Sequence, residues 1–195
     1  MKVINKRKTY HSVNKIFPSR WSPRAMSGEK VSKKELFTLF EAARWAPSSY
    51  NGQPWHFIYA FRGTKHWKTL SNLMVEFNQQ WTKNAGVLLV IFSRNTFYYN
   101  NKRSRTHTFD TGAAWGNFAL QGSFNNLVVH GMEGFDYGKA AKVLGIPKGY
   151  TVEAMAAVGK PGRKKDLPKD IQKMEAQSDR KKVNAFVFEG RFKKK

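Results

Sequence analysis

A helix that ends at a proline, followed by a polar turn and a strand, is the feature that most limits how this chain can fold. The S-x-x-E pattern of a capping box begins at Ser32, and apolar residues follow it at helical spacing. Pro47 disfavours helical dihedral angles in the residue before it, so we expect the helix to span 33–45. A strand, 55–61, comes next. Residues 46–53 should therefore form a binding loop between the helix and the strand.

This loop carries most of its polar groups in side chains that can both donate and accept hydrogen bonds. Ser48 and Ser49 supply hydroxyls, and Asn51 and Gln53 supply amides. Such groups suit the edge of a heteroaromatic ring. The alternative is a polar turn that satisfies only its own backbone.

Strands and helices are interspersed along the rest of the chain, and no internal repeat is visible. The expected helices are 33–45, 64–80, 110–129 and 137–143, and the expected strands are 55–61, 86–93, 131–135, 151–159 and 184–189. Residues 93–108 should form a long loop, and 160–182 a surface connection with at most a short helix. The pattern indicates a sheet covered by helices in one domain, 1–195, with a basic N-terminal segment, 1–18, and a C-terminal strand and basic tail, 183–195.

The helix expected after Asp110, its candidate N-cap, carries very small residues on one face. Gly112, Gly116 and Ala119 recur at three- and four-residue spacing. Because glycine inside a helix costs up to about 1 kcal/mol relative to alanine, we expect a helix or a neighbouring chain to pack closely against this face. The alternative is an ordinary buried helix of a monomer.

Composition limits the class of protein. The chain has 195 residues, of which 41% are hydrophobic, enough for one sizeable core. Its longest apolar run, 86–92, is far shorter than the roughly 20 residues of a membrane span, and the N-terminus lacks the apolar block of a signal peptide, so we expect a soluble cytoplasmic protein. There is no cysteine, and the five histidines show no metal-ligand spacing. Redox chemistry would therefore need a bound cofactor.

Five segments together resemble the FMN-dependent nitroreductase family. RWAPSSYNGQPWHF, from Arg44, is similar to the family's signature loop, and four more follow the family order: SRWSPR, FNQQWTKNAGVLLV, FDTGAAWGNFALQG and HGMEGF, which begin at Ser19, Phe77, Phe109 and His130. The resemblance covers most of residues 19–190. It implies an α+β fold with a central mixed sheet flanked by helices. It also implies an obligate homodimer with two FMN sites at the interface, each built from both chains.

The resemblance assigns residues to the flavin. Arg20, Ser22 and Arg24 are close enough in sequence for two guanidinium groups and a hydroxyl to hold the phosphate, with a solvated basic turn as the alternative. Arg180 matches a later phosphate-binding residue, although its neighbours Lys181 and Lys182 leave that choice open. The full set implied for cofactor binding is Arg20, Trp21, Ser22, Arg24, Pro47, Ser48, Ser49, Asn51, Gln53, Asn78, Met132, Glu133, Gly134 and Arg180.

The resemblance also implies which part of the flavin each residue contacts. Asn78 would meet the ribityl chain or the pyrimidine edge, and the Gly134 amide would lie near N5, with Glu133 orienting the segment. Trp81 stands where enteric members have a lysine beside N1. Positive potential for the reduced ring would then come from Arg20, Arg24 or Lys83.

The implied reaction is ping-pong reduction of small electrophiles, such as nitroaromatics or quinones, by NADH or NADPH through flavin N5. No side chain need act as a nucleophile, because the cofactor carries the chemistry. Phe97, Tyr98 and Tyr99 would form the substrate wall, or else belong to the core.

The charge balance points to a different partner. Thirty-five Lys and Arg against thirteen Asp and Glu give a net charge of +22, beyond the roughly 2 to 8 usual for a small domain. The basic runs are scattered, and no nucleic-acid-reading motif is visible. The alternatives to an enzyme are therefore an FMN-binding protein with little turnover and a module that binds polyanions non-specifically on a flavoprotein fold.

Overall fold

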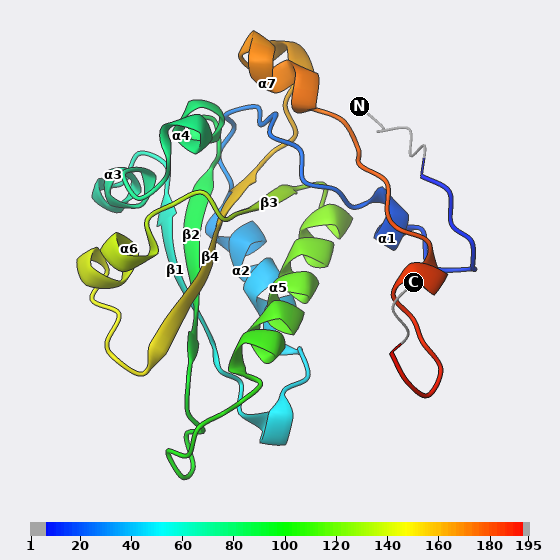
Figure 1. Ribbon diagram of the computed structural model, residues 1–195. Helices are drawn as coiled ribbons and strands as arrows, with labels where there is room; N and C mark the ends of the chain where they lie inside the picture. The colour runs from blue at the N-terminus through cyan, green and yellow to red at the C-terminus, as the bar shows by residue number, and fades with distance from the viewer. Residues whose placement is uncertain (1–6, 193–195) are drawn as a thin grey trace.

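The computed structural model describes residues 7–192, in which a sheet lies between two layers of helices (Figure 1). The longer helices are α2 (Lys33–Arg44), α3 (Lys65–Ser71), α4 (Glu76–Thr82), α5 (His107–Phe124), α6 (Tyr137–Val143) and α7 (Lys169–Met174). The short ones are α1 (Ile16–Ser19) and the 3-10 turns η1 (Ser49–Asn51), η2 (Lys164–Asp166) and η3 (Val183–Ala185). The expected α+β class is confirmed.

The sheet has four described strands in the order β1-β2-β4-β3. They are β1 (Trp55–Phe61), β2 (Val87–Arg94), β3 (Val128–Met132) and β4 (Tyr150–Gly159). All three neighbouring pairs run antiparallel. The expected mixed sheet is therefore wrong for the described residues, because no segment in them forms a parallel pair.

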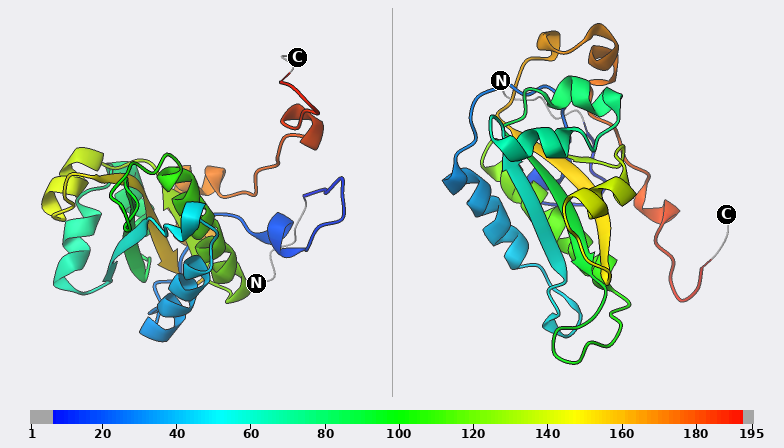
Figure 2. Two further views of the ribbon diagram at one scale, coloured as in Figure 1. Left: turned by 90° about the horizontal axis from the view of Figure 1, so that it is seen from below. Right: turned by 90° about the vertical axis from the view of Figure 1, so that its left-hand side faces the viewer.

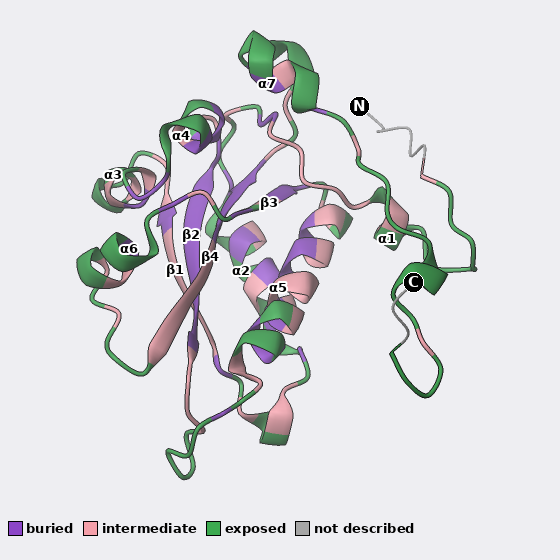
Figure 3. Ribbon diagram, in the orientation of Figure 1, coloured by how far each residue is buried: buried purple, intermediate pink, exposed green. Residues whose placement is uncertain are grey.

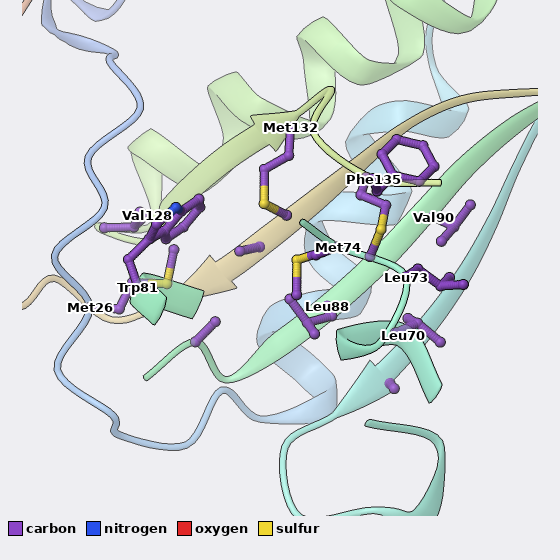
Figure 4. Close-up of a cluster of buried hydrophobic side chains, with 14 of the residues drawn as sticks. Met26, Leu70, Leu73, Met74, Trp81, Leu88, Val90, Val128, Met132 and Phe135 are labelled. Atoms are coloured by element: carbon purple, nitrogen blue, oxygen red, sulfur yellow. The ribbon is translucent and has the colours of Figure 1, made fainter. Parts of the chain in front are cut away.

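Alternate residues of the central strands enter two separate cores. Val87, Leu89 and Ile91 of β2 face α2 and α5, whereas Leu88 and Val90 face the side covered by α3, α4 and α6. Figure 3 shows the buried residues along the strands, and Figure 4 shows side chains of the second core. A strand buried on both faces explains the continuous apolar run in the sequence.

Local signals placed several elements correctly. Ser32 and Glu35 form the expected capping box, in which each side chain accepts a hydrogen bond from the other residue's backbone N–H. The strand expected at 55–61 and the helix expected at 137–143 have those bounds.

Two expected helices differ from the structure. The helix expected at 64–80 is split into α3 and α4, because the intervening backbone pairs with the segment after β3: Val75 N–H donates to Gly134 O at 3.0 Å. Helix α5 begins at His107 and ends at Phe124, so Asp110 is not its N-cap. The strand that follows is β3, Val128–Met132, in place of the expected 131–135.

The strand expected at 184–189 is absent. Residues 183–185 form η3, and almost the whole of the segment 178–192 is exposed. This segment, the C-terminal arm, projects away from the body of the molecule (Figure 2). Its start touches the N-terminal arm, residues 7–25, where Arg7 Nε donates to Ser178 O at 2.7 Å. A strand needs a partner edge, and the described chain offers none here.

Candidate cofactor-binding site

A cleft of about 670 Å³ lies between the N-terminal arm, helix α5 and the strands β3 and β4. Its size is typical of a site for a small ligand, which is roughly 300 to 1,000 Å³. Four of the residues assigned to the flavin line it: Arg20, Ser22, Met132 and Glu133. The structure therefore brings together two segments that lie more than 100 residues apart in the sequence.

The arm end of the cleft is strongly basic. Arg20 Nη1 donates to Ser22 Oγ at 3.3 Å. Burial lowers the pKa of Arg20, and the nearby positive charges of Arg180 and Arg7 lower it further. Three guanidinium groups this close repel one another, and a bound phosphate would relieve that repulsion. This end fits the phosphate of FMN.

Arg24 does not line the cleft. Its guanidinium lies 5.9 Å from the centre of the Phe77 ring. Its backbone N–H instead donates to the buried carboxylate of Glu175, at 2.9 and 3.0 Å, and so does that of Ala25. Glu175 thereby fixes the path of the arm, while only Arg20 and Ser22 of the expected phosphate group enter the cleft.

Asn78 and Trp81 lie behind the other end of the cleft. Asn78 Nδ2 donates to Gly134 O at 3.0 Å, and its Oδ1 accepts from Trp81 Nε1 at 3.1 Å. A Cβ on Gly134 would come within 2.7 Å of Asn78 Nδ2, so this position needs glycine. Trp81 is 1% exposed and belongs to the core (Figure 4). Its N–H is committed to Asn78, and both residues support the segment 132–134.

His130 joins this strand to the arm. Its Nδ1 donates to Pro23 O at 2.9 Å, and its ring lies 4.5 Å from that of Trp81. Burial lowers the pKa of His130 to about 4, with a smaller contribution from Arg24, against the hydrogen bond to Pro23. The imidazole is therefore neutral at physiological pH and positions the arm without adding charge.

Trp115, Tyr137 and Glu153 are among the residues of the cleft that were missed from the sequence. Trp115 of α5 lies over Gly131, where a Cβ would come within 2.9 Å of its ring, and it gives the cleft an aromatic wall. Tyr137 and Glu153 also line the cleft. A charged residue within the apolar run TVEAMAAVG was the available signal for Glu153.

The loop 46–53 lies elsewhere, at the N-terminal end of α5 (Figure 1). Ser49 N–H donates to the buried carboxylate of Asp110 at 3.1 Å, Ser48 Oγ accepts from Gln53 N–H at 3.1 Å, and Gln53 Nε2 donates to Asn51 Oδ1 at 3.0 Å. None of these residues, nor Pro47, lines the cleft.

The backbone of this loop is strained. Tyr50, Asn51 and Gln53 have φ of +49°, +52° and +43°, in the left-handed region that non-glycine residues seldom adopt. Strain of this kind is held in place by surrounding contacts and is concentrated at ligand sites.

The aromatic residues expected to contact substrate pack near that loop. Phe97 contacts Tyr50, with ring centres 5.8 Å apart, and Tyr98 Oη is 2.9 Å from His56 Nε2. Tyr98 and Tyr99 are exposed, so these two are not part of the core. Within one chain, the residues assigned to ligand binding thus form two groups, one at the cleft and one at the loop.

Helix α5 connects the two groups and exposes its small residues. A Cβ placed on Gly112 or Gly116 would meet nothing within 4 Å. Gly116 lines the cleft, whereas the open side of Gly112 is not explained by packing inside the described chain.

The chain matches the Nitroreductase family model over residues 18–74 and 60–160, and it belongs to that family. A crystal structure of an oxidoreductase containing FMN is 40% identical to this chain. The match covers 100% of both chains, and the two superimpose with a TM-score of 0.93. A nitroreductase family protein from Streptococcus pneumoniae is 19% identical, covers 87% of this chain and 96% of its own, and shares the fold with a TM-score of 0.67.

A curated relative matches a shorter stretch. It is the oxygen-insensitive NADPH nitroreductase of Helicobacter pylori strain J99, 40% identical over 64 residues. That match spans 33% of this chain and 30% of the relative.

Among residues 7–192, no helix has the length and apolar character needed to cross a membrane.

Proposed function

We propose that this protein is an FMN-dependent oxidoreductase that uses NADH or NADPH to reduce small electrophiles such as quinones or nitroaromatics. The observation that carries the proposal is the cleft, which joins a basic end at Arg20 and Ser22 to the strand end at Met132 and Glu133. The 40% identical oxidoreductase containing FMN, which matches this chain over its whole length, supports it. A cytoplasmic location, where reduced nicotinamide is available, is part of the proposal.

The residues around the cleft would make different contacts with FMN. Arg20 and Ser22 would hold the phosphate, with Arg180 adding positive potential. The backbone at 132–134 would meet the ring edge, and Trp115 would limit its position. When bound, FMN would supply the transfer of two electrons from nicotinamide to the acceptor. The protein would contribute orientation and electrostatic stabilisation.

We also propose that the working unit is a homodimer in which the loop 46–53 of one chain completes the cleft of the other. The separation of the two groups of residues within one chain supports this arrangement. So does the open face at Gly112 and Gly116, because a second helix could approach it closely. In the C-terminal arm Phe186 and Val187 are 60% and 58% exposed, as expected of residues that a partner would cover.

The spectrum of the purified protein tests the enzyme proposal. We expect a yellow protein with about one FMN per chain, bleached by anaerobic NADPH or NADH and restored by a quinone. A yellow protein that does not bleach would favour an FMN-binding protein with little turnover. A protein that stays colourless after incubation with excess FMN would contradict the proposal.

The net charge of +22 favours polyanion binding as a second function. The exposed residues Lys181, Lys182 and Arg191 of the C-terminal arm would contribute to it. Such binding would be independent of sequence and sensitive to salt.

A further inference from the structure

Three side chains form a hydrogen-bonded series that ends at the wall of the cleft. Ser93 is near the end of β2, His107 is the first residue of α5, and Glu153 is on β4. His107 Nδ1 lies 2.7 Å from Ser93 Oγ, and Ser93 Oγ lies 2.5 Å from Glu153 Oε1. Ser93 is fully buried, whereas the carboxylate of Glu153 reaches the cleft. The three side chains thus connect the cleft with the start of α5.

A β-bulge aims Glu153 into this position. Ile91 pairs with Ala154 and Phe92 with Val152, so Glu153 is the extra residue on β4. Regular alternation would place Glu153 on the face of Met155, which lies in the apolar core under α3 and α6. The bulge turns the carboxylate to the opposite face, toward Ser93. Bulges often re-aim a side chain in this way beside active sites.

Along these three side chains, each hydrogen bond is donated in the direction of the cleft. Ser93 has one hydroxyl hydrogen, which it donates to Glu153. Ser93 Oγ must then accept its second hydrogen bond from His107, so the Nδ1 of His107 carries a hydrogen. His107 Nδ1 and Glu153 Oε1 are 3.8 Å apart, so Ser93 is the link between them.

We propose that Glu153 donates a proton to the acceptor during its reduction in the cleft, and that His107 restores this proton through Ser93. The inference rests on the proposed function. An acceptor such as a quinone takes two electrons and one proton as a hydride equivalent and needs one more proton to leave as a hydroquinone. The Ser93 hydroxyl proton passes to the Glu153 carboxylate as the Nδ1 proton of His107 passes to Ser93. The other ring nitrogen of His107 takes up a proton from water, to which the side chain is 16% exposed. The new Glu153 O–H bond then breaks as an O–H bond forms on the acceptor.

The other ionisable groups along the cleft are less suited to this role. They are Arg20, Glu133 and Tyr137. Arginine does not release its proton in proteins. Burial, together with the charges of Glu133 and Glu153, raises the pKa of Tyr137 and makes it a weaker acid. Glu133 is exposed, and its carboxylate makes no hydrogen bond to the described residues that would carry a proton to it.

Rapid mixing of the FMN-loaded, pre-reduced protein with two acceptors tests the inference. Benzoquinone needs the extra proton, whereas ferricyanide takes one electron per ion and no proton. We expect E153Q to slow reoxidation by benzoquinone about 100-fold, within the range of general acid catalysis, and to slow reoxidation by ferricyanide far less. S93A keeps the carboxylate and removes the link, so it should slow the benzoquinone reaction by about tenfold or more.

The imidazole of His107 gives a readout that does not depend on turnover. In the wild type, ¹⁵N NMR should show a hydrogen on Nδ1 of His107, and in S93A this preference should be lost. His130 is the internal control, because its Nδ1 is held by Pro23 O in both proteins. If the wild type turns over and E153Q reacts with both acceptors at wild-type rates, the proton donor is wrong and the proposed function stands. A wild type that binds no FMN or does not bleach overturns both.

Discussion

Buried polar side chains, each bonded to a distant segment, shape the cleft at the scale of single residues. Glu175 holds the arm at Arg24 and Ala25, and Asn78 holds the segment after β3 at Gly134. A buried polar group that loses its partner costs about 1 to 3 kcal/mol, so these contacts specify one arrangement. Substitutions at this scale should change binding or stability through one identifiable contact.

Arg20 should contribute most of the phosphate affinity in the cleft. A hydrogen bond to a charged group is worth roughly 1.5 to 3 kcal/mol, so Arg20→Ala should weaken FMN binding about ten- to a hundredfold. Arg163→Ala removes the same charge from an exposed position that does not line the cleft and is the matched control. Fluorescence titration measures the affinity of the wild type and of each variant for FMN and for riboflavin. Equal affinity for FMN and riboflavin would remove the phosphate assignment.

His130 should make stability depend on pH. Its native pKa is lowered to about 4, whereas an unfolded histidine titrates near 6.5. The unfolded state alone therefore gains a proton as the pH falls between these values. The stability from this group is complete above about pH 6.5, and about 2 kcal/mol of it should be lost between pH 7 and pH 5. Urea unfolding at both pH values measures the loss.

His130→Asn is the comparison for that measurement. The asparagine amide can replace the Nδ1 donor to Pro23 but does not titrate. The variant should therefore lose less stability than the wild type on acidification. An identical dependence on pH in the two proteins would assign the effect to other groups.

Backbone pairing outside the regular elements matters at the scale of helices and strands. The sequence pattern of 64–80 predicts one helix, but the hydrogen bond between Val75 and Gly134 interrupts it and leaves two helices, α3 and α4. The same contact places Asn78 behind Gly134. The position of the segment 132–134 therefore depends on how closely α4 can approach it.

Gly134→Ala should disturb that approach. The new Cβ would lie 2.7 Å from Asn78 Nδ2 and 3.0 Å from Val75 Cγ2, and overpacking of this kind costs about 1 to 3 kcal/mol. Gly138→Ala is the control, since its Cβ would meet only Asp136 Oδ1 at 3.7 Å, and alanine favours a helix. Thermal unfolding should show a lower midpoint for the first variant and no loss for the second. Equal midpoints would show that α4 can move aside.

Gly116→Leu tests the role of the open face of α5. Inside the chain the new side chain meets nothing at Cβ, so the fold should survive. In a homodimer it should keep the helices apart, so light scattering should show monomers. The mass, and not the loss of FMN, is the readout, because Gly116 also lines the cleft. Lys68→Leu places the same side chain on the exposed surface of α3 and should stay dimeric and yellow. A flavin-replete monomer in the wild type would refute the shared site.

The whole molecule combines the proposed phosphate site of the cleft with a net charge of +22. Its net charge of +22 and its two projecting arms should attract any polyanion over a broad area (Figure 2). The contacts in the cleft are partly desolvated and are screened less by salt than exposed lysines are. Salt should therefore separate the two functions.

High salt should abolish DNA retention and leave the flavin in place. For duplex DNA, log K should fall with log salt by about 0.9 for each phosphate neutralised, so retention should be lost by a few hundred millimolar salt. Turnover with NADH and a quinone, measured in the same buffers, should remain detectable. Sequence-selective DNA binding that resists salt, together with no reduction of any acceptor, would favour the binding module.

Local sequence signals determined several elements of this protein. The capping box at Ser32, the period of α2, the apolar run of β2 and the strand β1 depend on neighbouring residues, whose spacing sets helix or strand before any distant contact forms. The motifs also led to the family, which the comparison with known proteins confirmed. Short motifs also pointed to Arg20 and Met132, which line the cleft, and their contact with FMN stays a prediction.

Only the tertiary structure decided which of these residues meet. It put Arg20 and Met132 in one cleft, left the loop 46–53 outside it, and turned Trp81 into the core. It also added Glu153, whose direction depends on a bulge in the pairing of β2 with β4. The physical reason is that strand register, bulges and long-range hydrogen bonds arise between segments far apart in the chain, where local spacing carries no information about the partner.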